Sequence, residues 1–134
     1  CHSPMKLQDP MKTVKALVGD GVIKSERCCG EAGTLAVSRP DISTQIRFRK
    51  EEELLRGEAQ LRQSGAVAPQ QNLKFLTSCP SCLQGLKRYE DDMASGLLEA
   101  DYIVVEMARH LLGETWLQDY VARANAGGIE RVLV

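Results

Sequence analysis

Cysteine is the residue type that offers this 134-residue chain the most chemistry, and its spacing is uneven. Two cysteines are adjacent in the stretch SERCCGEAG at residues 25–33, two more lie in the stretch CPSC at residues 79–82, and one opens the chain. The five cysteines are Cys1, Cys28, Cys29, Cys79 and Cys82. Thiolates bind metal ions and exchange disulfides, so the chemistry depends on whether the fold brings these sulfurs together.

The composition favours metal or redox chemistry over a framework of disulfides. Five cysteines cannot all pair internally. No apolar run approaches the roughly 20 residues that span a bilayer, and no leader pattern opens the chain, so we expect a cytoplasmic protein, whose thiols stay reduced. The net charge of −1 provides no field that would attract nucleic acid.

Strands are expected immediately before both cysteine motifs. The β-branched run GVIK at residues 21–24 leads to the adjacent pair, and LKFLT at residues 73–77 leads to CPSC. A third strand is predicted over DYIVV at residues 101–105, and residues 129–134 form a tail or a last short strand. Apolar spacing, glycines and prolines predict helices over residues 12–18, 40–65 (bent near Gly57), 80–89, 106–112 and 114–124.

Alternating strands and helices predict an α/β fold, in which helices cover both faces of a mostly parallel sheet in three layers. Loops that leave the carboxyl ends of such strands gather along one edge, where ligands bind. The two cysteine motifs should therefore meet at that edge. Residues 1–134 are predicted to form one domain, and because no strand pattern precedes Cys1 we expect a piece of a longer protein whose first strand is missing.

The adjacent cysteines can point to one centre only if the backbone turns there, which Gly30 permits. A CxxC motif that opens a helix turns both sulfurs toward one centre. Mononuclear zinc takes four ligands, whereas a multi-iron cluster accommodates all five thiolates, so five sulfurs at one edge indicate iron and sulfide. Two alternatives stay open: a structural zinc ion held by four of the cysteines, and thiol–disulfide exchange through CPSC.

Other residues receive simpler interpretations. His2 is expected near the site or exposed rather than as a ligand, and Glu31 is expected to be a carboxylate at a helix N-terminus. The charge run KEEE at residues 50–53 predicts a solvated helix face. Trp116 and Tyr120 share a helix face and are predicted to pack in the core. The sequence contains no Walker loop and no GxGxxG motif, so no nucleotide site is predicted.

Three stretches together resemble the cysteine-rich CCG domain: CHSP at residues 1–4, CCGEAG at residues 28–33, and CPSC at residues 79–82. That domain occurs in one of the subunits of heterodisulfide reductase, in the iron–sulfur subunit of glycolate oxidase, and at the end of fused FAD-linked oxidoreductases. Residues 101–112 and the ending through Val134 are most similar to the fused FAD-linked enzymes.

The resemblance implies a [4Fe-4S] cluster, noncubane in some members, that transfers electrons or cleaves a disulfide reductively. The ligands that it implies are Cys1, Cys28, Cys29, Cys79 and Cys82. It further implies a parent enzyme, a 2-hydroxy acid oxidase or a heterodisulfide reductase-like protein, whose upstream flavin and ferredoxin-like domains are the partners of this module. FAD belongs to that upstream part, so we expect no turnover from this piece alone, and its cluster is expected to be lost when thiols are oxidised.

Overall fold

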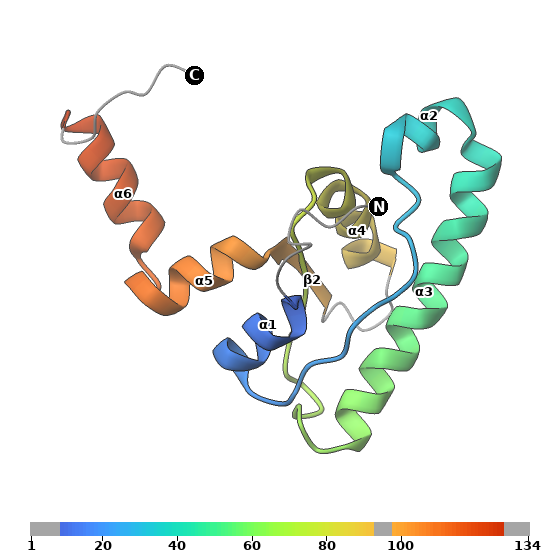
Figure 1. Ribbon diagram of the computed structural model, residues 1–134, viewed down its shortest axis with the longest axis horizontal. Helices are drawn as coiled ribbons and strands as arrows, with labels where there is room; N and C mark the ends of the chain where they lie inside the picture. The colour runs from blue at the N-terminus through green and yellow to red at the C-terminus, as the bar shows by residue number, and fades with distance from the viewer. Residues whose placement is uncertain (1–8, 93–97, 128–134) are drawn as a thin grey trace. The chain divides into compact units, whose positions relative to one another are not determined.

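The computed structural model describes residues 9–92 and 98–127, and the chain divides into two compact units, Cys1–Ile103 and Val104–Val134 (Figure 1). In chain order the elements are α1 (Pro10–Val18), η1 (Ala32–Thr34), α2 (Leu35–Ser38), α3 (Pro40–Gln63), β1 (Leu73–Thr77), α4 (Pro80–Asp92), β2 (Leu98–Tyr102), α5 (Ile103–Leu112) and α6 (Trp116–Asn125).

The sheet of the first unit contains β1 and β2 in the described residues, paired in parallel from Leu73 opposite Leu98 to Thr77 opposite Tyr102. Parallel neighbours require a crossover, and α4 lies within the connection between these two strands. The prediction of an α/β fold with a parallel sheet is thereby confirmed.

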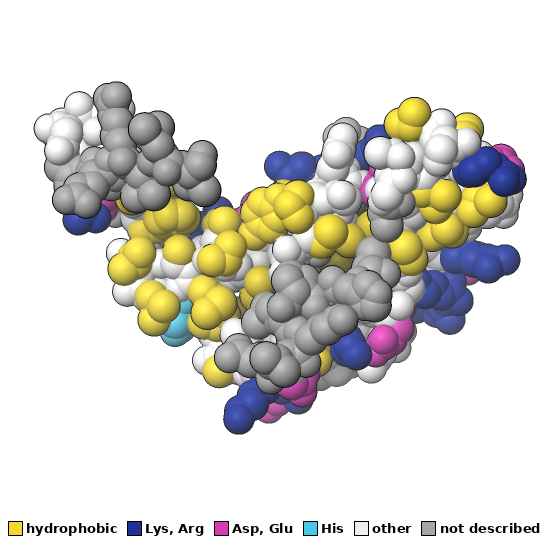
Figure 2. Space-filling view, turned by 45° about the horizontal axis from the view of Figure 1, so that its top comes forward, with side chains coloured by type: hydrophobic (Ala, Val, Ile, Leu, Met, Phe, Trp, Pro, Cys, Tyr) yellow, Lys and Arg dark blue, Asp and Glu magenta, His cyan; other side chains and the backbone are white. Residues whose placement is uncertain are grey.

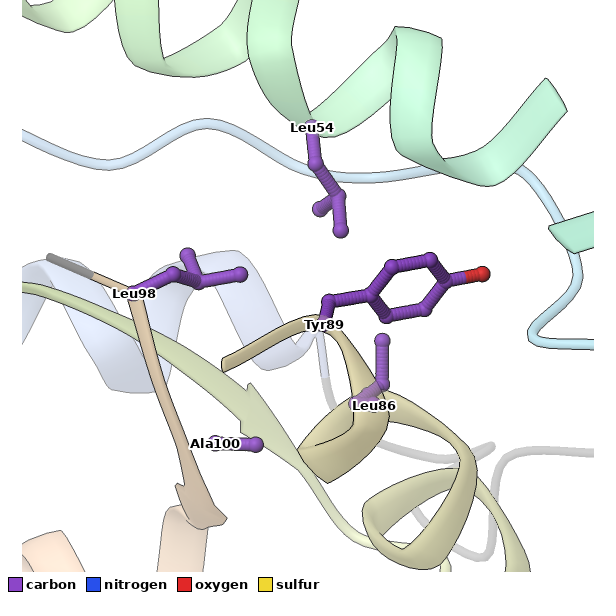
Figure 3. Packing of buried hydrophobic residues seen from close by; sticks show 5 residues of the cluster. All are labelled: Leu54, Leu86, Tyr89, Leu98 and Ala100. Carbon is purple, nitrogen blue, oxygen red and sulfur yellow. The ribbon is translucent and has the colours of Figure 1, made fainter. Parts of the chain in front are cut away.

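One face of this sheet carries the core. Alternate residues of a strand point to the same face, and in this register the inward residues of both strands lie side by side. The core residues are Leu73 and Phe75 of β1, Leu98 and Ala100 of β2, Leu86 and Tyr89 of α4, and Leu54 of α3. Figure 3 shows the Tyr89 ring between Leu54 and Leu86. Both α3 and α4 are therefore fixed on the same face of the sheet, and a third layer on the other face stays a prediction.

The predicted strand 73–77 and the helices that begin near Pro40 and at Pro80 are confirmed. The helix predicted over residues 12–18 is present and begins earlier, at Pro10, where the Asp9 carboxylate accepts a hydrogen bond of 3.0 Å from the Met11 N–H. Helix α3 runs through Gly57 as one element.

Two strand predictions are wrong. Residues 21–24 form no strand, because the chain that follows them bonds to side chains of α3 rather than to a neighbouring strand. The strand predicted over residues 101–105 lies at Leu98–Tyr102, and the β-branched residues after it begin α5. Leu98 and Ala100 are the residues of the observed strand that face the core. Pairing with β1 therefore determines where the strand lies, rather than the strand propensity of the β-branched residues 103–105.

The second unit contains α5, from its second residue onward, and α6, with Gly113 at a φ of 93° between them. Trp116 is half-buried, but Tyr120 is 47% exposed and α6 has no buried residue, so the core prediction is wrong for Tyr120. Figure 2 shows apolar side chains on the surface of this unit. The large exposed ones are Val104, Leu111, Leu112, Leu117, Tyr120 and Val121.

Within the described residues, every helix is too short or too polar to cross a membrane. The predicted tail or strand at residues 129–134 lies outside the described residues.

Candidate functional site

A buried lysine of α3 holds the chain that enters the cysteine pair. Lys50 is only 3% exposed, and its Nζ donates hydrogen bonds to the Arg27 carbonyl oxygen at 2.8 Å and to Glu53 Oε2 at 3.0 Å. It also donates to the Ser25 hydroxyl oxygen. The ammonium lies 4.9 Å from the centre of the Phe75 ring of β1, within cation–π range. The positive charge thus links the incoming chain, α3 and the sheet.

Glu53 completes this network as its acceptor. Its carboxylate accepts a hydrogen bond from the Ser25 hydroxyl and from the backbone N–H groups of Glu26 at 2.9 Å and Arg27 at 3.2 Å. Burial raises the pKa of Glu53, but the hydrogen bonds from Ser25, Glu26 and Lys50 outweigh it and lower the pKa to about 2. Glu53 is therefore ionised at neutral pH and anchors residues 25–27.

The prediction that residues 50–53 form a solvated face is wrong for Lys50 and Glu53. These two residues are three apart, which places them on the same side of α3, where residues 25–27 lie. Glu52, between them in sequence, is exposed and pairs with Arg27 at 3.4 Å. In the sequence, the network is visible only as a lysine and a glutamate three residues apart. Exposed helices have the same spacing, so it does not predict that the pair is buried.

The backbone turns immediately after the cysteine pair, as Gly30 was predicted to allow. Gly30 has a φ of +81°, in the left-handed region that favours glycine, and its carbonyl oxygen accepts a hydrogen bond of 3.0 Å from the buried Ser43 hydroxyl of α3. A Cβ atom at Gly30 would lie 3.2 Å from the Ser43 carbonyl oxygen. Both the backbone angle and the close approach to α3 therefore require glycine here.

Glu31 fastens the loop to α4. Its carboxylate forms an ion pair of 2.6 Å with Arg88, and its side chain is 9% exposed. The stem of Glu31 lies against Gly85, where any Cβ atom would overlap it. Glu31 does lie immediately before the short helix η1, as predicted, but its carboxylate pairs with a side chain of α4.

These tethers bring Cys29 to the CPSC motif. The sulfur atoms of Cys29 and Cys82 are 3.2 Å apart, and Cys29 is 4% exposed. Burial, followed by hydrogen bonding and repulsion from Cys29 and then Cys79, raises the pKa of Cys82 to about 12. The Cys82 thiol therefore interacts with the other two thiols and holds its proton tightly.

The pKa of Cys79 is shifted in the opposite direction, although Cys79 lies in the same motif. The backbone N–H of Cys82 lowers the pKa of Cys79 most, and the Cys82 thiol and the Ser81 N–H lower it further against the effect of burial. These amides belong to the first turn of α4, where N–H groups favour a thiolate. Cys79 also donates its own N–H to the Thr77 hydroxyl oxygen at 3.2 Å, which connects the motif to the end of β1.

Of the five predicted ligands, Cys82 lies in contact with Cys29 and also interacts with Cys79. Cys28 is exposed, and its sulfur accepts a hydrogen bond of 3.4 Å from the Gly30 N–H. Cys1 and His2 lie outside the described residues. Within residues 9–92 and 98–127, no three histidine, cysteine or acidic side chains are grouped as a ready-made metal site.

The donor chemistry nevertheless fits a thiolate-bound metal group. Cys82 shares contacts with two other sulfurs, and soft sulfur donors select zinc, copper(I) and iron–sulfur clusters. A fourth thiol, that of Cys28, comes from the same turn as Cys29. The same arrangement also allows two sulfurs to join as a disulfide, since Cys29 and Cys82 are already in contact.

The family model that matches this chain is described as a domain of unknown function, DUF3400, and it covers residues 87–134. That match begins after Cys82, so it includes the end of α4, β2, α5 and α6 but no cysteine. No curated protein and no solved structure matches the chain.

Proposed function

We propose that this chain is an iron–sulfur electron-transfer module of a FAD-linked oxidoreductase. The observation that carries the proposal is the contact between Cys29 and Cys82, whose sulfurs come from segments 53 residues apart and lie 3.2 Å from each other. Cys82 also interacts with Cys79, which follows the end of β1, the edge at which an α/β fold binds ligands.

Several contacts hold the chain around the cysteine pair in a fixed position, which supports a binding site that needs a defined geometry. The chain is held before the pair by Lys50 and Glu53, at Gly30 by Ser43, and after it by the pairing of Glu31 with Arg88. A buried lysine costs free energy unless it is paired, and these bonds supply its partners. Such an arrangement is expected where two distant segments must present their sulfurs to one group.

In this proposal the ligands of a [4Fe-4S] cluster are Cys29, Cys79 and Cys82, joined by Cys28 from the same turn and by Cys1. The bound cluster would supply one-electron transfer, with a potential set by hydrogen bonds to its sulfurs and by burial. The chain's own residues hold the ligands: Cys79 receives N–H groups from the first turn of α4, which favour its thiolate form.

The proposed partners are upstream flavin and ferredoxin-like domains of the parent protein, located in the cytoplasm, with FAD as the other electron carrier. The resemblance of the three cysteine stretches to the CCG domain supports this assignment. The parent would oxidise a 2-hydroxy acid or act as a heterodisulfide reductase-like enzyme.

A structural zinc ion is the second candidate. Three thiols that share contacts through Cys82 need one more donor to reach the four ligands of a closed zinc site, and Cys28 is adjacent to Cys29. Such a site would be redox-silent and would stabilise the loop or a docking surface.

Anaerobic reconstitution separates the two candidates. The purified chain is incubated with ferrous iron, sulfide and a thiol reductant in one sample, and with zinc in another, followed by desalting and metal analysis. Bound iron and sulfide in equal amounts, with broad visible absorption that bleaches on reduction, is the expected result. Zinc retained at one ion per chain, with no iron retained, would overturn the cluster assignment and favour the structural site.

A further inference from the structure

The contact between Cys29 and Cys82 also defines a modification site. We propose that, in the metal-free chain, a small disulfide such as oxidised glutathione joins these two cysteines as a disulfide and thereby closes the site to metal. The first part depends only on the geometry of the two thiols. The second part rests on the proposed function, because it requires these cysteines to be ligands.

The geometry already favours this pair. The two sulfurs are 3.2 Å apart, and a disulfide bond is about 2.05 Å long, so the sulfurs must approach by roughly 1 Å. The backbones that carry them are held together beside the contact, since Glu31 packs on Gly85 and pairs with Arg88 in α4. Bond formation therefore requires adjustment of side chains rather than the docking of a loop.

The other thiols have different surroundings. Cys79 is the competing partner of Cys82, because the two thiols also hydrogen-bond, and the Cys79 sulfur lies at the first turn of α4 among the backbone N–H groups of Ser81 and Cys82. Cys28 is an exposed residue, and its sulfur accepts a hydrogen bond from the Gly30 N–H. Cys29 is buried and Cys82 is partly exposed, so a small disulfide in solution reaches Cys82 before Cys29.

The reaction proceeds in two exchange steps. Cys82 first gives up its tightly held proton to a base in the solvent, and its sulfur then attacks one sulfur of oxidised glutathione in a slow step. This breaks the glutathione disulfide, releases one glutathione thiolate and leaves a mixed disulfide on Cys82. The Cys29 thiolate then attacks the sulfur of Cys82 and releases the second glutathione. Two protein thiols are oxidised, one glutathione disulfide is reduced to two thiols, and the two protons pass from the cysteines to the glutathione thiolates.

The consequence is a site that opens only under reducing conditions. Once Cys29 and Cys82 are joined, neither sulfur can act as a thiolate ligand. A further exchange with reduced glutathione or with a dithiol reverses the bond and restores both ligands. Metal loading of this module would thus follow the thiol–disulfide balance around it.

Peptide mapping tests whether Cys29 and Cys82 form the disulfide. The metal-free chain is treated anaerobically with oxidised glutathione, its remaining thiols are alkylated, and it is digested with trypsin, which releases residues 28–47 and 75–87 as separate peptides. The expected result is one linked species of these two peptides whose fragmentation places the bond between Cys29 and Cys82. A loop within residues 75–87, joining Cys79 to Cys82, or a link through Cys28 would overturn the proposal.

Cysteine variants identify the bonded pair without relying on fragmentation of the linked peptides. The double variant Cys28→Ser/Cys79→Ser retains the proposed pair and should form the linked species, whereas Cys29→Ser/Cys79→Ser should not, although it keeps one cysteine in each peptide. Linkage lost from the first variant, or retained in the second, contradicts the assignment.

Iron loading tests whether the disulfide closes the site to metal. Chain oxidised with glutathione disulfide should take up little iron on reconstitution without a reductant, and should regain full uptake after treatment with dithiothreitol. Equal uptake before and after reduction would overturn the closure of the site. If fully reduced chain takes up no iron while the Cys29–Cys82 link forms, the proposed function fails and the modification site stands.

Discussion

The buried ammonium group of Lys50 donates a hydrogen bond of 2.8 Å to the carbonyl oxygen of Arg27, the residue immediately before the cysteine pair. Helix α3 therefore does more than cover the sheet, because its side chains determine where the chain enters the site. The same lysine bonds to Glu53, whose carboxylate receives the N–H groups of Glu26 and Arg27. The position of Cys29 beside Cys82 consequently depends on charges that are remote from the sulfurs.

Replacement of Lys50 by methionine should destabilise the fold. The variant keeps the apolar stem against Phe75 but leaves the partly buried Glu53 carboxylate without its cation, which we expect to cost about 2–3 kcal/mol. Urea denaturation of the metal-free chain measures this cost. Lys24→Met is the matched control, because Lys24 pairs with Glu26 at an exposed position and should change little. Equal effects of the two substitutions would contradict a special role for Lys50.

Stability should fall in acid because of Glu53. Its pKa is lowered from 4.5 to about 2 in the folded chain, so its contribution is fully present above pH 4.5 and is lost as the pH falls from there toward 2. A decrease of that size corresponds to about 3 kcal/mol at most. Urea midpoints measured from pH 7 to pH 3 should decline less steeply for Glu53→Gln than for the unaltered chain. Parallel profiles for the two proteins would refute this assignment.

Local pattern was sufficient where an element is defined by its own residues. The apolar run of β1 and the proline at the start of α4 predicted both elements correctly, as Pro40 did for α3. The sequence also predicts that Cys29 meets the CPSC motif, but it predicts this through a strand at residues 21–24. In the structure, side chains of α3 perform that task.

The rest of the site could not be predicted, because it depends on partners distant in sequence. Lys50 and Ser25 are 25 residues apart, and nothing near Lys50 distinguishes a buried charge run from a solvated one. Glu31 pairs with Arg88, which is 57 residues away. The sequence around a buried charged side chain looks the same as the sequence around an exposed one. Only the packing of α3 and α4 on the sheet determines which charged side chains are buried.

Gly30→Ala should disturb the turn after the cysteine pair. Alanine would have to adopt a φ of +81° and place its methyl carbon 3.2 Å from the Ser43 carbonyl oxygen. The first effect alone costs about 1–2 kcal/mol. Gly33→Ala is the control, since Gly33 has a φ of +62° and a methyl carbon added there would have no neighbour within 4 Å, so it should carry only the backbone cost. A loss of stability no greater at Gly30 than at Gly33 would remove the role assigned to the contact with α3.

Two further glycines, both inside helices, should respond to alanine in opposite directions. Alanine is favoured over glycine in a helix by about 1 kcal/mol, and Gly57 of α3 has open space around it, so Gly57→Ala should stabilise the chain by up to that amount. In α4, a methyl group at Gly85 would overlap the stem of Glu31, so Gly85→Ala should destabilise the chain and loosen the pair between Glu31 and Arg88. Thermal or urea denaturation measures both changes. Stabilisation by both substitutions would mean that Glu31 does not lie against Gly85.

Cys29→Ala should reduce metal loading as strongly as Cys82→Ala, because the two sulfurs are in contact and both are proposed ligands. Iron and sulfide bound after anaerobic reconstitution measure the loss, and Ser81→Ala is the control within the same motif, since Ser81 contributes its backbone N–H, which alanine retains. Folding of each variant is followed by circular dichroism, because Cys29 is buried and its replacement removes a packed sulfur. A folded Cys29→Ala chain with undiminished iron would show that the buried cysteine only packs against α4. Iron lost equally from both cysteine variants, but not from Ser81→Ala, would mean that segments 53 residues apart share one metal group.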